Sequence, residues 1–475
     1  LQAGAYTKYS LTWVLFSTCA IGLVLQGMAA RVGIVTGKHL AQLCRQEYSP
    51  PKWISLWIMS EISIIASDVQ AVTTSAIALK ILFKIPLWLG CILTALDALT
   101  FLSIHLLGEW SLLIGHCIQS LELFFVMIVA AMSVCFFWTF SMNLPDPVEA
   151  LKGTFVPYLP SYGLHTAVGV VGSLILPQNY YVHSAVVLSR DVDRTSPREV
   201  REANKYLFVD AGVALGIAGL INFAVISTFA EQFFHEDCAT LGLVYTPALC
   251  CARVLFILPP LPPRLTLSPY RPAPPQPASL RTPTTSTTTT ASASRCPHTT
   301  VISSRRILPL PSANNGAAGF CQHIGLSDAD APLRASLGPT AGLIWALGLL
   351  ASGQSSTMTI TYAGQFINEG FGNFHLPLYQ RISICRLVAL IPAVLAALFE
   401  ATHPSSMDDA TQIGNIIASI CVPFSILPML KFCVSSRLMG IHAVGSATVA
   451  LVLLVTAFLI SMNAMLFYET LMAIE

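Results

Sequence analysis

Long apolar runs separated by short polar segments make up most of this chain. Each run is close to the roughly 20 residues that an α-helix needs to cross the hydrocarbon core of a bilayer. They predict membrane-spanning helices at residues 10–30, 54–79, 85–107, 111–140, 164–189, 204–230, 338–364, 382–400, 411–432 and 440–468. The pattern is typical of an all-α, polytopic membrane protein with about ten transmembrane helices.

The composition supports this interpretation. The chain of 475 residues is 54% hydrophobic and only 10% charged, with a mean hydropathy of +0.67. Ordinary soluble domains are about 25% charged, so too few charges are present here to cover a soluble surface. The net charge of +1 indicates no nucleic-acid partner. We expect an integral, multi-pass protein whose surroundings are the lipid bilayer.

One segment interrupts the apolar pattern. Residues 254–313 are rich in Pro, Ser and Thr, a composition that cannot bury a core. We therefore expect helices at 1–251, a disordered insert at 252–315, and further helices at 316–475. The insert is either a mucin-like stalk or unspliced sequence. A disulfide is left open among the cysteines outside the clear apolar runs, which are Cys238, Cys250, Cys251, Cys296 and Cys321.

Basic residues predict the orientation in the membrane. Lys and Arg gather in the segments 31–52, 190–205 and 431–437, and around Arg381 and Arg386. The positive-inside rule places these segments in the cytoplasm, because the alternate short loops carry few basic residues. Because each predicted helix crosses the membrane once, the chain then starts on the outer side, and the insert lies on that side as well.

The stretch "LILPQNYYVHSAVVLSR" (174–190) places a proline and several polar residues inside an apolar run. Pro177 has no N–H to donate and disturbs the carbonyl of Ser173, one turn earlier. Inside lipid an unpaired backbone group costs several kcal/mol. A break is tolerated where the freed carbonyl faces a polar cavity or an ion, as in many secondary transporters. The alternative is a packed, kinked helix whose Asn179 and His183 bond to neighbours.

"LPQNYYVHSAVVLSR" resembles the signature "MPHN…HSALV.SR" of the Nramp family (natural resistance-associated macrophage proteins), which are proton-coupled divalent-metal transporters. "ARVGIVTGKHLAQLCR", "EISIIASDVQ" and "GLIWALGLLASGQSSTMTITYAGQFINEGF" are similar to further blocks of that family. The resemblance runs from Leu1 to about Leu430, except for 252–315. It implies a LeuT-like inverted-repeat fold with metal held between the broken first and sixth helices, in an algal- or plant-like member.

The opening residues "LQAGA" follow directly after the first helix in that family. In the family this helix carries an Asp-Pro-Gly-Asn motif whose Asp and Asn bind the metal. The resemblance therefore predicts a chain that lacks the first helix and two of its ligands. We expect that the chain as given does not transport metal. The charge pattern places residue 1 on the outer side, and this agrees with the absence of the first helix.

The resemblance also implies which residues approach the metal. It places a coordinating carbonyl at Ser173 and an amide that comes near the ion at Asn415. Leu176 stands where the family has methionine, and leucine cannot coordinate. Without that soft sulfur ligand, we expect a preference for harder ions or weaker binding overall. A hydrogen bond between helices is the alternative role for Asn415.

A second set of residues is implied for proton movement. Asp68 matches the family's proton-accepting aspartate, and His183 matches the second histidine of its signature. Arg381 and Arg386 match arginines that line the proton exit, although cytoplasmic anchoring explains both equally well. Gln178 replaces a family histidine, so one candidate proton group is lost. A hydrogen-bonded carboxyl and a neutral packing histidine are the structural alternatives for Asp68 and His183.

We predict a proton-coupled transporter of Mn²⁺ or Fe²⁺ type that works by alternating access and is not an enzyme. Its partners are divalent metal ions and protons, it holds no resident cofactor, and it sits in the plasma membrane or a vacuolar or endosomal membrane. The alternatives are a receptor-like or scaffold member that does not transport, or a truncated, inactive product. The residues at Leu176, Gln178 and Ala71, where the family often has Met, His and Glu, favour these alternatives.

Overall fold

The computed structural model describes residues 1–94, 112–142, 144–235, 238, 244–247, 308–310, 319–322, 325–326, 338, 340–372, 378–400, 402 and 406–472. The chain divides into two compact units, which are Leu1–Thr246 with Cys321–Glu475, and Pro247–Phe320. The predicted disorder of 252–315 concerns residues that lie almost wholly outside the described ranges. Cys238, one of the five cysteines left open above, is disulfide-bonded.

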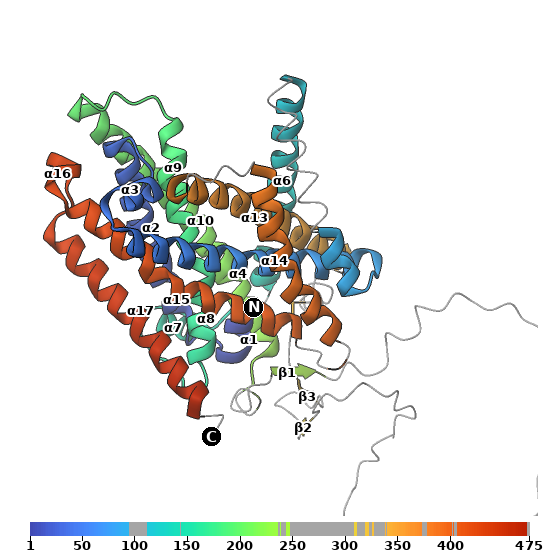
Figure 1. Ribbon diagram of the computed structural model, residues 1–475. Helices are drawn as coiled ribbons and strands as arrows, with labels where there is room; N and C mark the ends of the chain where they lie inside the picture. The colour runs from blue at the N-terminus through green and yellow to red at the C-terminus, as the bar shows by residue number, and fades with distance from the viewer. Residues whose placement is uncertain are drawn as a thin grey trace, which may run out of the picture. The chain divides into compact units, whose positions relative to one another are not determined.

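The larger unit is built of helices (Figure 1). The long helices are α2 (Thr12–Thr36), α4 (Pro50–Phe83), α6 (Leu112–Met142), α10 (Pro197–Phe233), α13 (Thr340–Phe371), α14 (Leu378–Phe399), α15 (Ser406–Val434) and α17 (Ser446–Met472). The shorter helices are α1 (Gln2–Thr7), α3 (Leu40–Glu47), α7 (Pro147–Phe155), α8 (Leu164–Leu174), α9 (Pro177–Val186) and α16 (Ser436–Met439). Single 3₁₀ turns follow α9 at Val187–Ser189 and α16 at Gly440–His442, and residues 87–94 are also helical.

Two short strands flank the insert and a third lies within it, and the boundary between the two units passes through the two flanking strands. They are β1 (Val244–Pro247), β2 (Leu308–Leu310) and β3 (Gly319–Gln322). Most of the predicted helix at 85–107 lies outside the described residues. The other apolar runs coincide with helices of the larger unit.

Five of the described helices are long and apolar enough to cross a membrane, namely α2, α4, α10, α15 and α17. Helix α10 begins at Pro197, before the apolar run that predicted it at 204. Ser196 caps this helix, since its hydroxyl accepts a hydrogen bond from the N–H of Glu199, and Pro197 suits the first helical position. Hydropathy thus marked only the part of the helix that lies in lipid.

Helix α4 lies at the centre of the larger unit, packed against α13, α14 and α15. In its most apolar window, 72% of the residues are buried, against 33% for the peripheral α17. Close packing needs small residues. A Cβ added at Gly353 of α13 would stand 3.1 Å from the carbonyl oxygen of Ala71 on α4. The small residues in "ASGQSSTMT" therefore let α13 approach α4 closely.

His39 lies between α2 and α3, outside the membrane-spanning helices. Its side chain is 5% exposed, and its backbone N–H donates to Oε1 of Gln42 at 3.2 Å. Nδ1 of His39 has no hydrogen-bond partner in the part of the chain that the structure describes. Burial lowers the pKa of His39 to about 4, so the imidazole is neutral in the folded protein at neutral pH.

We expect His39 to make folding sensitive to acid. Its folded pKa lies below the unfolded value of about 6.5, so the unfolded chain binds the proton first. The stability that this residue contributes is present above pH 6.5 and is lost as the pH falls towards 4. At pH 4.5 that loss is about 2–3 kcal/mol.

Denaturant unfolding at pH 7 and pH 4.5 measures this contribution. His39→Asn should lose clearly less stability between the two pH values than the parent protein. His442→Asn, at a half-exposed position, serves as the matched control. An identical pH dependence in the parent and His39→Asn would contradict the expectation.

Candidate functional site

The predicted break in the sixth family helix is present in the fold. Helix α8 ends at Leu174 and α9 begins at Pro177, with Ile175 and Leu176 in non-helical conformations between them. Pro177 occupies the first position of α9, where its missing N–H is no loss. The carbonyl of Ser173 has no donor one turn later, because that residue is Pro177. The segment is therefore two half-helices rather than one kinked helix.

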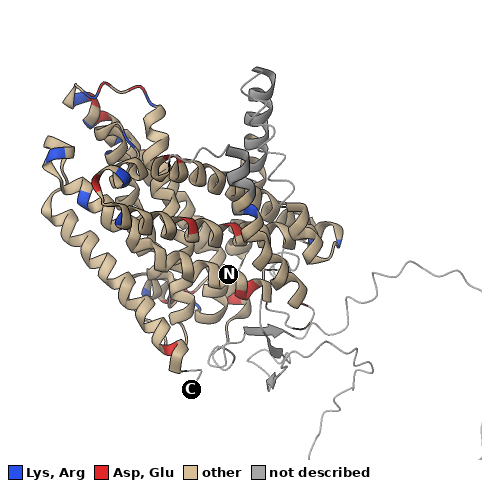
Figure 2. Ribbon diagram, in the orientation of Figure 1, with Lys and Arg blue, Asp and Glu red and all other residues tan. Residues whose placement is uncertain are grey.

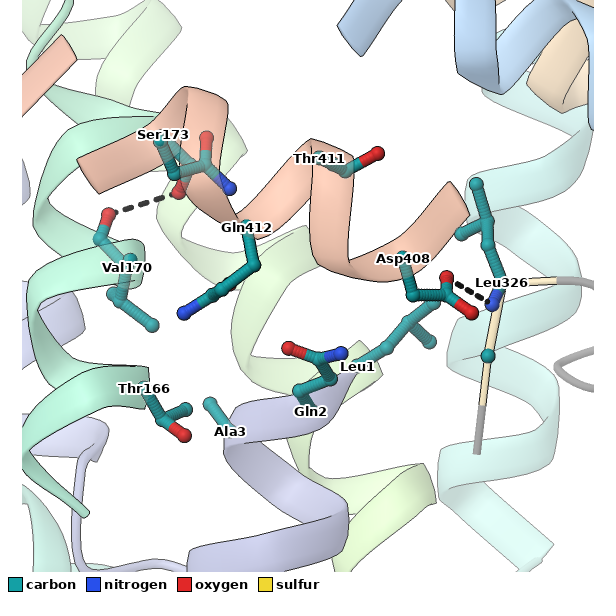
Figure 3. A pocket seen from close by; sticks show the side chains of 13 residues that line it. Leu1, Gln2, Ala3, Thr166, Val170, Ser173, Leu326, Asp408, Thr411 and Gln412 are labelled. Atoms are coloured by element: carbon teal, nitrogen blue, oxygen red, sulfur yellow. Dashed lines mark hydrogen bonds between the residues drawn. The ribbon is translucent and has the colours of Figure 1, made fainter. Parts of the chain in front are cut away.

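A cavity of about 200 Å³ lies beside this break (Figure 3). Ser173 at the end of α8 and Asn415 on α15 both line it, so the two expected metal-approaching residues meet at one place. The hydroxyl of Ser173 donates to the carbonyl of Val170 at 2.8 Å, and the backbone carbonyl of Ser173 lacks its helical partner because of Pro177. A liquid water fills about 30 Å³, so the cavity has room for an ion with part of its hydration shell.

Asn415 brings an unpaired oxygen to the site. Its Oδ1 is buried and has no hydrogen-bond partner among the described residues. A buried acceptor without a partner costs about 1–3 kcal/mol. Through Oδ1, Asn415 makes no hydrogen bond to another helix among the described residues, and its role as a metal ligand stays a prediction.

Two glycines bring α8 against α15. A Cβ at Gly172 would collide with the carbonyl oxygen of Asn415, and a Cβ at Gly169 would collide with the side-chain amide of Gln412. Gln412 lines the same cavity and donates from Nε2 to the carbonyl of His165 on α8 at 2.9 Å. Small residues on α8 thus permit the close approach that brings the donor atoms together.

Oxygen atoms dominate the polar lining of the cavity. Thr166, Thr411 and Asp408 contribute hydroxyl and carboxylate groups, and Oδ1 of Asp408 accepts from the N–H of Leu326 at 3.0 Å. Leu176 is half-buried and does not line the cavity. Within the described ranges, no three or more His, Cys, Asp or Glu side chains come together where they could hold a metal ion. Hydroxyl and carboxylate oxygens, such as those that line this cavity, are ligands that suit hard cations.

A second polar cluster joins Asp68 of α4 to Arg386 of α14. The two side chains form an ion pair and are 2% and 5% exposed. Arg386 also donates to the carbonyl of Thr357 at 2.9 Å and to Oγ1 of Thr361 at 3.1 Å, both on α13. The interpretation of Arg386 as a cytoplasmic anchor is wrong, because its charge lies inside the helix bundle instead of reaching water.

Gln178 continues this cluster from α9. The hydroxyl of Ser63 donates to Oε1 of Gln178 at 2.7 Å, and Nε2 of Gln178 donates to Oγ of Ser67 at 2.6 Å. Gln178 is 1% exposed, and Ser67 directly precedes Asp68. Buried hydrogen bonds therefore link the start of α9, at the helix break, to Ser63 and Ser67 on α4, the helix that carries Asp68.

The other predicted proton residues stand apart from both clusters. His183 is half-buried, and its Nε2 has no hydrogen-bond partner within the described residues. Arg381 belongs to α14, but its side chain lies outside the described residues. Sequence reasoning missed the groups that complete the clusters. Four of them are hydroxyl residues in pairs one helical turn apart, and that spacing on one helix face could have revealed them. The full set is Ser63 with Ser67, Thr357 with Thr361, and Gln412.

The chain is similar to known proteins over most of its length. The family model "Natural resistance-associated macrophage protein-like" matches residues 1–246 and 312–469. "Metal transporter nramp1 homolog" of Dictyostelium discoideum is 35% identical over 93% of this chain and 65% of its own length. "Metal transporter Nramp3" of Arabidopsis thaliana is 34% identical over 99% of this chain and 75% of its own length. The chain thus spans about two thirds to three quarters of these relatives.

Solved structures show the same fold. A manganese transporter of Eremococcus coleocola superposes with a TM-score of 0.65 at 23% identity, covering 97% of this chain and 80% of that one. The inward-facing form of Mhp1 gives a TM-score of 0.51 at 12% identity, covering 92% and 73%. The predicted all-α, LeuT-like fold is confirmed. Because the family model matches most of the residues of this chain, the chain belongs to the Nramp family.

Proposed function

We propose that the protein moves a divalent metal ion of Mn²⁺ or Fe²⁺ type across a membrane by alternating access, coupled to protons. Its family consists of transporters and not enzymes. One observation carries the proposal. Ser173, whose carbonyl lacks a helical partner, and Asn415, whose Oδ1 is unpaired among the described residues, line one cavity at the helix break. The plasma membrane or a vacuolar or endosomal membrane is its proposed place.

We further propose that hard oxygen donors set the ion preference. Mn²⁺ binds carbonyl and carboxylate oxygens readily, whereas Cd²⁺ gains more from a thioether. Leu176 stands where the family has methionine, so this helix offers no sulfur. Transport should therefore discriminate weakly against hard ions such as Mg²⁺.

Asp68 is the proposed acceptor of the coupled proton. Protonation removes the carboxylate charge and weakens the ion pair with Arg386, which joins α4 to α14 and α13. Loosening that junction gives a physical means to couple proton uptake to helix movement. Gln178 does not titrate, but its hydrogen bonds to Ser63 and Ser67 hold the start of α9 against α4, the helix that carries Asp68. The ion and the proton would then act on neighbouring parts of one network.

A second candidate is a receptor-like or scaffold member that no longer transports. Leu176, Gln178 and Ala71 favour it, since each stands where the family often has a coordinating or titratable side chain. Uptake of Mn²⁺ into proteoliposomes decides between the two functions. The chain is tested alone and also preceded by a helix that carries the Asp-Pro-Gly-Asn motif. Saturable uptake above empty vesicles in the second form supports transport, and its absence supports the receptor-like role.

Leu176→Met should raise the ratio of Cd²⁺ to Mn²⁺ uptake about tenfold, because one metal–thioether contact is worth roughly 1.4 kcal/mol. Competition between the two ions in the helix-preceded form measures the ratio. Leu188→Met, in the 3₁₀ turn after α9, controls for a methionine placed elsewhere. An unchanged ratio at equal expression would show that position 176 does not meet the ion in any transport state.

A further inference from the structure

A second and larger cavity, of about 790 Å³, lies between α2, α10 and the segment that leads into α17. Three basic residues line it, Arg31 near the end of α2 and Arg201 and Lys205 near the start of α10. Because α2 and α10 pack against each other, these residues gather at one end of the helix pair. Figure 2 shows Lys and Arg concentrated at the end of the bundle where α3 and α16 lie.

The positive charge in this cavity is not neutralised by the protein. None of the residues lining the cavity is acidic, and in the described part of the chain Arg31, Arg201 and Lys205 make no ion pair. Of the nearby acidic residues of α10, Glu202 and Asp210 pair with other arginines, and Glu199 accepts a hydrogen bond from the N–H of Asp193 at 3.2 Å. Three like charges around one space repel one another, so an anion between them is stabilising.

Most of the other lining residues are apolar, with Asn204, His442 and Thr448 as the polar exceptions. Phe208 and Val209 are 46% and 54% exposed, and Ile441 is 75% exposed. A Cβ added at Gly27 would lie 2.9 Å from Cδ2 of Phe208, so the ring of Phe208 packs directly on the backbone of α2. The cavity therefore combines a cationic end with an apolar wall on two membrane-spanning helices.

We propose that this cavity binds an anionic phospholipid. The headgroup phosphate lies among Arg31, Arg201 and Lys205, and an acyl chain runs along the exposed side chains of Phe208 and Ile441. Basic pockets between transmembrane helices commonly hold anionic headgroups. A free phosphate would use only the cationic end, and the exposed apolar wall beside it favours the lipid. The volume is within the range of ordinary ligand sites.

Native mass spectrometry of the purified chain tests the proposal without any need for transport. The detergent-solubilised protein is incubated with phosphatidylglycerol, with phosphatidylcholine, or with glycerol phosphate as the soluble anion. We expect retained phosphatidylglycerol adducts, few phosphatidylcholine adducts, and no displacement by equimolar glycerol phosphate. Equal retention of both lipids, or displacement by glycerol phosphate, overturns the assignment.

Two variants locate the site. Each surface cation contributes about fivefold to anionic-lipid binding, so R31Q/R201Q/K205Q should weaken it by about a hundredfold. K38Q/R190Q/R198Q removes the same charge from residues that do not line the cavity, and it should keep most of the affinity. Gly27→Leu displaces the ring of Phe208 from the cavity wall without a change of charge and should also weaken binding. Equal losses in the two triple variants would show general charge attraction instead of this site.

Discussion

Replacing Arg386 with methionine is expected to destabilise the folded protein by about 3–5 kcal/mol, because it leaves the carboxylate of Asp68 buried without its partner. Removing both charges should cost much less, since no uncompensated ion is then left inside the bundle. The double variant Asp68→Asn/Arg386→Met is therefore expected to recover most of the stability that Arg386→Met loses. This rescue is the mark of an ion pair rather than of lost packing.

Thermal and denaturant unfolding of the purified variants measure these differences. Arg198→Met is the matched control, since Arg198 pairs with Glu202 at 3.2 Å on the surface and its side chain is 88% exposed. Exposed pairs contribute little, so this control should unfold close to the parent protein. If Arg386→Met unfolded like Arg198→Met, the buried pair would not hold α4 and α14 together.

The second large effect is expected at Gly172. A Cβ there collides with the carbonyl oxygen of Asn415, so Gly172→Ala must push α8 away from α15. Overpacking of this kind costs about 1–3 kcal/mol. It also moves the carbonyl of Ser173 relative to Asn415, and misplaced ligands weaken metal binding by about 10- to 100-fold.

Gly216→Ala provides the comparison. Gly216 lies inside helix α10 and has nothing within 4 Å of an added Cβ, so the substitution changes helix propensity alone. That gain of roughly 1 kcal/mol is common to both variants, and the difference between them isolates the contact between α8 and α15. Unfolding free energies, and the concentration dependence of Mn²⁺ uptake in the form preceded by the Asp-Pro-Gly-Asn helix, are the two measurements. Equal stability and equal uptake in both variants would refute the role given to Gly172.

Hydropathy could predict most of the membrane helices, because lipid demands apolar side chains over a fixed length. It misjudged where they end, since backbone hydrogen bonding continues beyond the lipid. Helix α10 starts at Pro197 for that reason, with Ser196 as its cap. The break before Pro177 was predictable from covalent chemistry alone, because proline lacks the N–H that the carbonyl of Ser173 needs.

The polar clusters were only partly predictable. The family resemblance named Ser173, Asn415, Asp68 and Arg386 as candidates, but it did not show that the last two form an ion pair. No local periodicity can reveal a contact between residues 318 positions apart. The charge pattern even suggested an anchoring role for Arg386. The positive-inside rule uses only the position of a basic residue in the sequence and contains no information on the direction of its side chain.

The separation between Asp68 and Arg386 also has a consequence for biosynthesis. A ribosome adds about 5–20 residues each second, so the 318 residues between the partners take roughly 15–60 s to make. Throughout that interval the newly inserted α4 has no guanidinium to meet its aspartate. The contact that joins α4 to α14 can form only late, after most of the chain has left the ribosome. Final assembly around α4 is therefore a late event in the life of each new molecule.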